Sequence, residues 1–140
     1  MNKLTLARTI VERLNIERAE VPSEEEDRFH LTHNAGFNPE ELPNNFCVNF
    51  YLEIYLEEGF KMELQYFAEF DLDSPIDQEF MDSSFPHVNA PAIAYPYLRS
   101  TVSTVCLNSG YNPVILPTIN FQAMYKRSIE EQEDEKLESR

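Results

Sequence analysis

The segment from Phe46 to Leu72 alternates apolar and polar side chains, and this pattern constrains the fold more than any other feature of the sequence. Every even position is apolar or aromatic in the run that ends at Leu56, and again in the run that begins at Phe60. Because successive side chains of a strand point to opposite faces, each run predicts a strand with one buried face. Gly59 lies between the runs and can take the positive φ of a tight turn. The sequence therefore predicts a long antiparallel hairpin.

The opposite face of this hairpin carries aromatic residues among charged ones. Tyr51, Tyr55 and Phe67 occupy odd positions, which otherwise hold mostly polar side chains. Two interpretations are open. Cross-strand aromatic pairs can simply stiffen a sheet, or an exposed aromatic strip can be a contact surface for another protein.

The chain before the hairpin is harder to assign. The segment from Leu4 to Ala19 fits an alternating strand with gaps at Arg8 and Glu12, and it fits a helical stripe equally well. Beyond an acidic run, one short strand is predicted near Arg28 to His33. Periodicity alone leaves both strand and helix open for the N-terminal segment.

A segment almost free of charge follows the hairpin. From Ser83 to Tyr125, the sequence has a single Asp, Glu, Lys or Arg, which is Arg99. Its first half predicts a helix over Ala92 to Gly110, capped by Asn89 and ended by the left-handed glycine of NSG. Pro96 should bend this helix or delay its start. Small hydroxyl residues replace charges on its outer side, which indicates burial against another layer.

A second helix is predicted after Asn120, and it should fray into the acidic sequence EEQEDEKLESR. A chain of 140 residues has the size of one ordinary domain. We therefore expect a single domain over residues 1–126 and a frayed or disordered acidic tail over residues 127–140.

Charge and the scarcity of catalytic motifs exclude several function classes. A net charge of −14 repels nucleic acid and anionic lipid alike. No apolar run approaches the roughly 18 residues of a membrane span, so we expect a cytoplasmic protein without membrane insertion. His30 and His33 would point to opposite faces of a strand, while Cys47 and Cys106 are typical of reduced, buried small hydrophobes. We predict no enzyme activity, no metal site and no cofactor.

The sequence YPYLRSTVSTVCLNSGYNPVILPTINFQAMY, residues 95–125, resembles the SecB family of bacterial export chaperones. The resemblance rests on an aromatic-Pro-Tyr-x-Arg opening, a neutral helix that ends at Gly110, a connection with Pro113 and Pro117, and an Asn-Phe-x-Ala helix start. The hairpin and its PNN lead-in look like the third and fourth strands of that family.

The resemblance implies an α+β fold, in which a long helix packs across a four-stranded antiparallel sheet and a short C-terminal helix follows. It also implies that the N-terminal segment is a strand. The assembly it implies is a homotetramer, built as a dimer of dimers with the long helices between the sheets.

The resemblance further implies an ATP-independent holdase, because proteins of this family hold unfolded polypeptide clients in extended apolar grooves. The candidates for client binding are Tyr51, Tyr55, Phe67, Phe85, Tyr95, Tyr97 and Leu98. For each of these the alternative is a place in the core or in a subunit interface, and for Leu98 that alternative is favoured.

Many members of the family deliver preproteins to the ATPase SecA by means of acidic residues on the outer sheet face. The matching positions here are Glu20 and Glu63, although Lys61 stands where the family has an apolar residue. Other SecB-like proteins hold the antitoxin of a toxin-antitoxin system, so a chaperone dedicated to one such partner is the second hypothesis.

Overall fold

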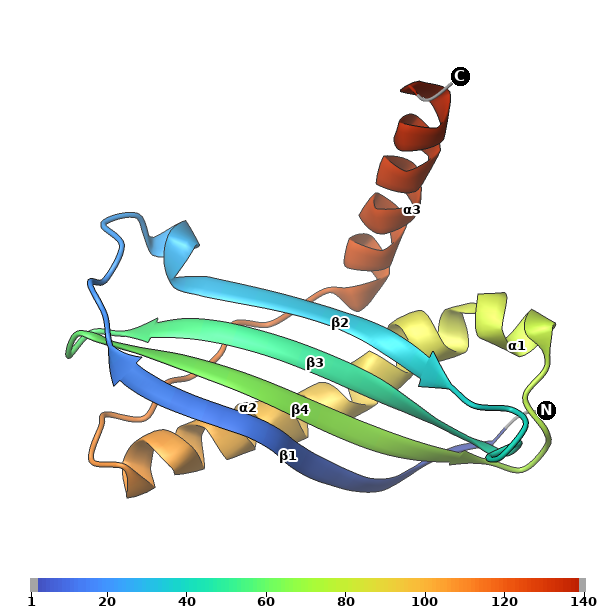
Figure 1. The fold of residues 1–140 in the computed structure, drawn as a ribbon, viewed down its shortest axis with the longest axis horizontal. Helices are drawn as coiled ribbons and strands as arrows, with labels where there is room; N and C mark the ends of the chain where they lie inside the picture. The colour runs from blue at the N-terminus through green and yellow to red at the C-terminus, as the bar shows by residue number, and fades with distance from the viewer. Residues whose placement is uncertain (1–2, 139–140) are drawn as a thin grey trace.

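The computed structural model describes residues 3–138 and has an α+β architecture. Its strands are β1 (Leu4–Arg18), β2 (Phe29–Phe37), β3 (Asn45–Leu56) and β4 (Phe60–Leu72). Its helices are α1 (Gln78–Asp82), α2 (Ala90–Asn108) and α3 (Phe121–Glu138), with a 3-10 turn η1 (Glu25–Arg28) and a π-helical turn η2 (Phe85–Asn89). The four strands form one antiparallel sheet in the order β1-β4-β3-β2. The predicted fold class is confirmed (Figure 1).

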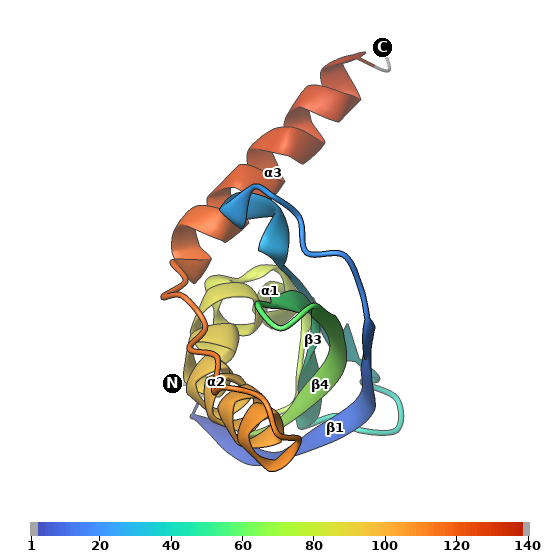
Figure 2. The same ribbon diagram turned by 90° about the vertical axis from the view of Figure 1, so that its left-hand side faces the viewer.

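The predicted hairpin is confirmed as β3 and β4. Its even positions are buried, apart from the partly buried Phe60, and they form the core together with the inward side of α2. Gly59 turns the chain with a φ of 92°. In the end-on view of Figure 2, the sheet curves around α2. We call the face of the sheet against α2 the inner face and the opposite one the outer face.

The N-terminal segment is strand β1, which pairs with β4 along its whole length. Its ambiguous pattern has a local cause. The register with β4 shifts between Leu6 and Arg8 and again between Val11 and Arg13, so each shift inserts one residue into the alternation. The gaps at Arg8 and Glu12 therefore mark bulges in a strand rather than turns of a helix.

Two predicted boundaries are corrected by the structure. Strand β2 begins at Phe29 and continues to Phe37, so it is longer than the predicted strand ending at His33. Asn89 makes no side-chain capping bond, because the backbone is already helical in η2 and runs directly into α2. Pro96 accordingly lies inside α2 and does not delay its start.

Helix α2 and the chain that follows it are joined by side-chain hydrogen bonds. Beyond α2, Gly110 has a φ of 89°, as a left-handed glycine should. The chain then turns back along the helix. The Tyr95 hydroxyl donates to the Pro117 carbonyl oxygen at 2.6 Å, and the Ser103 hydroxyl donates to the Val114 carbonyl oxygen at 2.7 Å. These two bonds position the start of α3.

Helix α3 starts in the core and then projects away from the body of the molecule (Figures 1 and 2). Phe121 is buried, whereas every described residue from Lys126 onward is exposed. The backbone is helical to Glu138, which differs from the fraying expected beyond residue 126. The last two positions of the predicted tail lie outside the described residues. No helix within residues 3–138 has the length and apolar character needed to cross a membrane.

Candidate functional site

One end of the sheet carries an apolar groove that we call the end groove. It forms where the chain between β2 and β3 leaves the sheet, and its cavity volume is about 620 Å³. Its apolar lining comprises Gly36, Phe37, Leu42, Phe46 and Cys47. Phe37 and Phe46 stack at 5.7 Å between ring centroids, and Leu42 is half exposed. The sequence predicted only a connection here, so this groove was missed.

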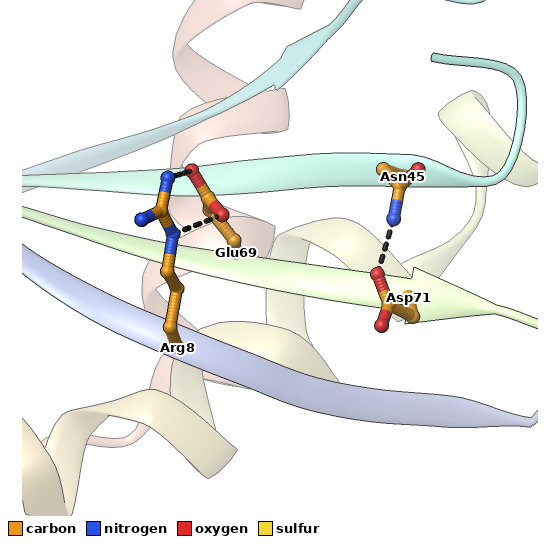
Figure 3. A network of polar contacts seen from close by, with 4 residues as sticks. All are labelled: Arg8, Asn45, Glu69 and Asp71. Carbon is orange, nitrogen blue, oxygen red and sulfur yellow. Dashed lines mark hydrogen bonds and ion pairs between the residues drawn. The ribbon is translucent and has the colours of Figure 1, made fainter.

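The polar groups around the end groove are paired with one another (Figure 3). Arg8 of β1 donates two hydrogen bonds to the Glu69 carboxylate of β4, at 2.6 and 3.1 Å. The Asn45 amide of β3 donates to the Asp71 carboxylate of β4. Because these groups already have partners, the apolar lining is the part of the groove that gains most from contact with a ligand.

The ion pair between Arg8 and Glu69 can be tested directly by titration of Glu69. The hydrogen bond from Arg8 lowers the pKa of Glu69 below its ordinary value of 4.5. We expect Arg8→Gln to bring this pKa back towards 4.5, measured by NMR titration of the Glu69 side-chain carboxyl carbon. Since the folded pKa is lowered, the bond contributes stability above the ordinary pKa and loses it as pH falls through the lowered one. An unchanged Glu69 titration in the variant would contradict the pairing, and Arg13→Gln is the matched control.

A second, shallower hollow lies further along the outer face of the sheet. We call it the outer hollow, and its cavity volume is about 270 Å³. Side chains that line it come from all four strands and include Arg13, His30, Tyr51, Glu63 and Gln65. Tyr51 is 38% exposed and is therefore open to contact from outside.

Phe67 lies between the end groove and the outer hollow. It is opposite Asn49 in the ladder, while Tyr51 is opposite Gln65, which makes Tyr51 and Phe67 diagonal neighbours on the outer face. Tyr55 is further along β3 and lines a separate hollow beside η1. Glu53, opposite Glu63, separates Tyr55 from Tyr51.

These features together form a line along the outer face that we call the outer track, from Cys47 through Phe67 and Tyr51 to Tyr55. The eight steps from Cys47 to Tyr55 span roughly 27 Å of extended strand. The aromatic strip predicted from sequence is therefore part of a longer surface, interrupted once by the charged row at Glu53.

The other predicted client-binding residues lie in different environments. Phe85 is 40% exposed and stacks on Phe80, and Tyr97 is 54% exposed on the outward side of α2. Tyr95 and Leu98 are core residues of the single chain, 5% and 0% exposed, which corrects the prediction for Tyr95 and agrees with the alternative favoured for Leu98. Burial raises the pKa of Tyr95 to about 12.

The two acidic residues predicted for partner docking also differ from each other. Glu20 is exposed just beyond β1. The Glu63 carboxylate lies 3.1 Å from the Lys61 ammonium and 3.7 Å from the Arg13 guanidinium. Bonding to Glu63 is the largest cause of a raised pKa at Lys61. Glu63 thus has two cationic neighbours on the same face, but Lys61 is shared with Glu17 at 3.6 Å and Glu53 lies opposite Glu63.

The outward side of α2 carries an uncharged stripe that we call the α2 stripe. It consists of Ile93, Tyr97, Ser100, Thr104 and Leu107. All five are exposed, and their spacing of four, three, four and three residues places them in one row along the helix. Val11 and Leu14 of β1 are exposed large apolar residues as well. The sheet therefore covers only the inward side of this neutral helix, and the α2 stripe on the outward side is exposed in the single chain.

The sequence did not identify a hollow that lies between β2, η2 and the start of α3. We call it the α3 hollow, and its cavity volume is about 510 Å³. His33 and His87 line it from the body, and Met124, Tyr125 and Ile129 line it from α3. His30, by contrast, is on the outer face, so the two histidines of HLTH point to opposite faces as predicted. No sequence pattern predicts that His33 and His87 line the same hollow, because 54 residues separate them.

Neither a cluster of metal-binding side chains nor an activated thiol is found in the described part of the chain. Within residues 3–138, no group of three or more His, Cys, Asp or Glu side chains could hold a metal ion. Cys47 and Cys106 are free thiols, and burial is the main cause that raises the pKa of each. A raised pKa disfavours the reactive thiolate.

Comparison with known proteins gives consistent results. The family model for the preprotein translocase subunit SecB matches residues 30–132. The protein-export protein SecB of Anaplasma phagocytophilum is 31% identical over 78 residues, which cover 54% of this chain and 49% of that protein. The match thus spans about half of the length of that relative.

Two solved structures share the fold. One is the SecB-like chaperone Rv1957 of Mycobacterium tuberculosis, in complex with a ChAD peptide from the Rv1956 HigA1 antitoxin. It has a TM-score of 0.60 at 15% identity and covers 83% of this chain and 90% of its own. The other is a protein of unknown function from Streptococcus agalactiae, with a TM-score of 0.56 at 12% identity, covering 84% of this chain and 99% of its own.

The family model extends from β2 to residue 132 inside α3, and it includes the motif from Tyr95 to Tyr125 that carries the resemblance. Its matched region is well over half of the chain, and the four-stranded antiparallel sheet and the helix placement agree with the fold that the resemblance implied. The chain belongs to the SecB family.

Proposed function

We propose that this chain is an ATP-independent chaperone that holds unfolded polypeptide along the outer track. The observation that carries the proposal is the alignment of apolar side chains along the track, in which the end groove is followed by Phe67, Tyr51 and, beyond the charged row at Glu53, Tyr55. Its length suits an extended segment of about eight residues. Membership of the SecB family supports the same function.

The chemistry of the track favours tolerant binding over recognition of one sequence. Aromatic and aliphatic side chains gain free energy from any apolar partner, at roughly 25 cal/mol for each Å² removed from water. Arg8 and Glu69 beside them are paired with each other, so these charged groups do not require a specific polar partner from the client. The net charge of −14 would keep a loaded complex dispersed. Binding of this kind requires neither a cofactor nor catalysis.

A second candidate is a chaperone dedicated to one partner, such as an antitoxin. The structural neighbour from M. tuberculosis, in complex with an antitoxin peptide, supports this candidate. Glu63 already contacts Lys61 and Arg13 within the chain, which weakens its attraction for a basic partner, but Glu17 and Glu53 keep this part of the face acidic. Glu20 remains the candidate for contact with SecA.

We also propose that the α2 stripe is covered by a second copy of the chain, in a homotetramer built as a dimer of dimers. Its repeat of four and three residues is the spacing of a helix that packs along another helix. Tyr97 and Leu107 of the stripe are 54% and 63% exposed in the single chain. Because each is already about half buried, covering the rest of such a side chain between subunits contributes roughly 1 to 2 kcal/mol.

The test of the proposed function is suppression of aggregation. An aggregation-prone client is diluted from denaturant with and without this chain, in buffer free of ATP, and light scattering is followed. We expect scattering to fall as the chain approaches the client in concentration. Full scattering at a severalfold excess of the chain would refute the holdase.

Affinity purification from the native host then separates the two candidates, since one stoichiometric partner indicates a dedicated chaperone and many preproteins indicate export.

A further inference from the structure

Helix α3 is attached to the body through its first turns. Phe121 is buried, and its ring lies 5.3 Å from the His33 ring in an edge-on arrangement. One helical turn later, Tyr125 stacks on His87 with ring centroids 5.0 Å apart and planes 5° from parallel. Since Phe121 and Tyr125 are four residues apart, both rings lie on one side of the helix. Two histidines of the body thus contact two aromatic rings of α3.

The two histidines come from different elements that meet at the α3 hollow. His33 is on the inner face of β2, opposite Phe50 of β3, and its ring centroid is 6.1 Å from that of Phe50. His87 belongs to η2, and its Nε2 is 2.7 Å from the Met81 carbonyl oxygen. π-helical turns of this kind are often found at functional sites.

No carboxylate lines the α3 hollow within the described residues. The titratable groups among its lining residues are His33 on β2, His87 on η2 and Tyr125 on α3. Phe50 faces His33 from β3 and carries no charge. Lys126 and Arg127 on α3 are exposed, and so are Glu130 and Glu131, but none of them lines the hollow. A positive charge on His33 would therefore meet aromatic rings and a second histidine, without an anion to offset it.

We propose that His33 makes the attachment of α3 sensitive to protons, so that the helix is docked at neutral pH and released on acidification. Burial favours the neutral imidazole of His33, and two charged rings lining one hollow would repel each other. Release would expose Phe121 and Tyr125 and open the α3 hollow. The inference concerns the free chain and is independent of whether the outer track binds clients.

The direction of the pH dependence follows from the surroundings of His33. Burial, and secondly the charge of His87, lower the pKa of His33 below its ordinary value of 6.5. When α3 leaves, that pKa returns towards 6.5, so the released state binds more protons. Docking is therefore fully stable above about 6.5 and weakens as pH falls below it. Each unit that separates the two pKa values lowers the docking constant about tenfold at acid pH.

Methionine-methyl NMR of the full chain tests the proposal. Met124 lines the α3 hollow and reports docking, while Met62 is in the core and serves as an internal reference. We expect the Met124 methyl signal to move between about pH 8 and about pH 5 with the midpoint of the His33 ring signal, while Met62 stays in place. Amide exchange over residues 121–125 should rise in the same range.

Variants of His33 distinguish protonation of this side chain from general effects of acid on the protein. His33→Phe keeps an aromatic ring against Phe121 but cannot titrate, so its Met124 signal should stay at the docked position down to about pH 5. His30→Phe, on the same strand but the outer face, should keep the wild-type response. If His33→Phe perturbs the core, His33→Gln provides a second neutral side chain. A Met124 signal that ignores pH in the wild type, or that still moves in both His33 variants, would overturn the proposal.

Discussion

The double substitution Tyr51→Ser with Phe67→Ser is expected to weaken binding of an unfolded client by about 30-fold to 160-fold. The two side chains are diagonal neighbours in the middle of the outer track, so an extended segment along it would contact both. Loss of two aromatic contacts at roughly 1 to 1.5 kcal/mol each corresponds to a change of that size. The measurement is fluorescence anisotropy of a labelled client that does not fold under the conditions used.

Loss of affinity has to be separated from loss of fold. Both positions are on the outer face and outside the core, so we expect the urea midpoint of the variant to move little. Leu137→Ser is the matched control, because Leu137 is 66% exposed on α3 and its substitution also removes an exposed apolar side chain. Unchanged client affinity in the folded double variant would place the binding site elsewhere, and equal weakening in the control would mean that binding follows total apolar surface.

The fold was largely predictable where a single strong period controls the local structure. The hairpin of β3 and β4 alternates without interruption, so its strands agree with the prediction to within one residue. The same rule was ambiguous for β1, because two bulges reverse the alternation inside one strand. Asn89 is the N-cap position of α2 as predicted, but its side-chain cap was wrongly expected, because the π-helical turn η2 already supplies helical backbone up to Asn89.

The candidate site was predictable only in part, for a different reason. Tyr51 and Phe67 come from adjacent strands of one hairpin, so period and turn position are enough to place them on the same face. The end groove instead needs Arg8, Phe37 and Glu69, and the sequence does not say that β1 pairs with β4 rather than with another strand. His33 and His87 line one hollow because η2 packs against β2, and the chain after α2 then returns α3 to both elements. Contacts between residues far apart in the sequence are where local patterns stop being informative.

The long neutral helix shows how a local pattern and the tertiary structure explain each other. Its inward side is covered by the sheet, where Leu98, Val102 and Cys106 are fully buried. Its outward side carries the α2 stripe, which lacks the Lys and Glu residues that a helix exposed to water usually has. The lack of charge is therefore best explained by a second protein surface, and the regular spacing of the stripe favours another copy of α2.

Substituting Tyr97→Glu together with Leu107→Glu should dissociate the assembly that we propose through the α2 stripe. In a symmetric pair of helices, the two substitutions on each copy would place four carboxylates in one interface. Burying a charge without a partner costs several kcal/mol for each carboxylate. We expect native mass spectrometry to show the wild type as a tetramer and the variant as a smaller species, with at least a hundredfold loss of association. Ile115→Glu is the control, because Ile115 is 80% exposed but lies outside the stripe, in the connection between α2 and α3. A monomeric wild type, or a variant that keeps its assembly, would contradict a role of the α2 stripe between subunits. A variant that dissociates but still binds client would show that the outer track of a smaller species is sufficient, since none of its residues belongs to the α2 stripe.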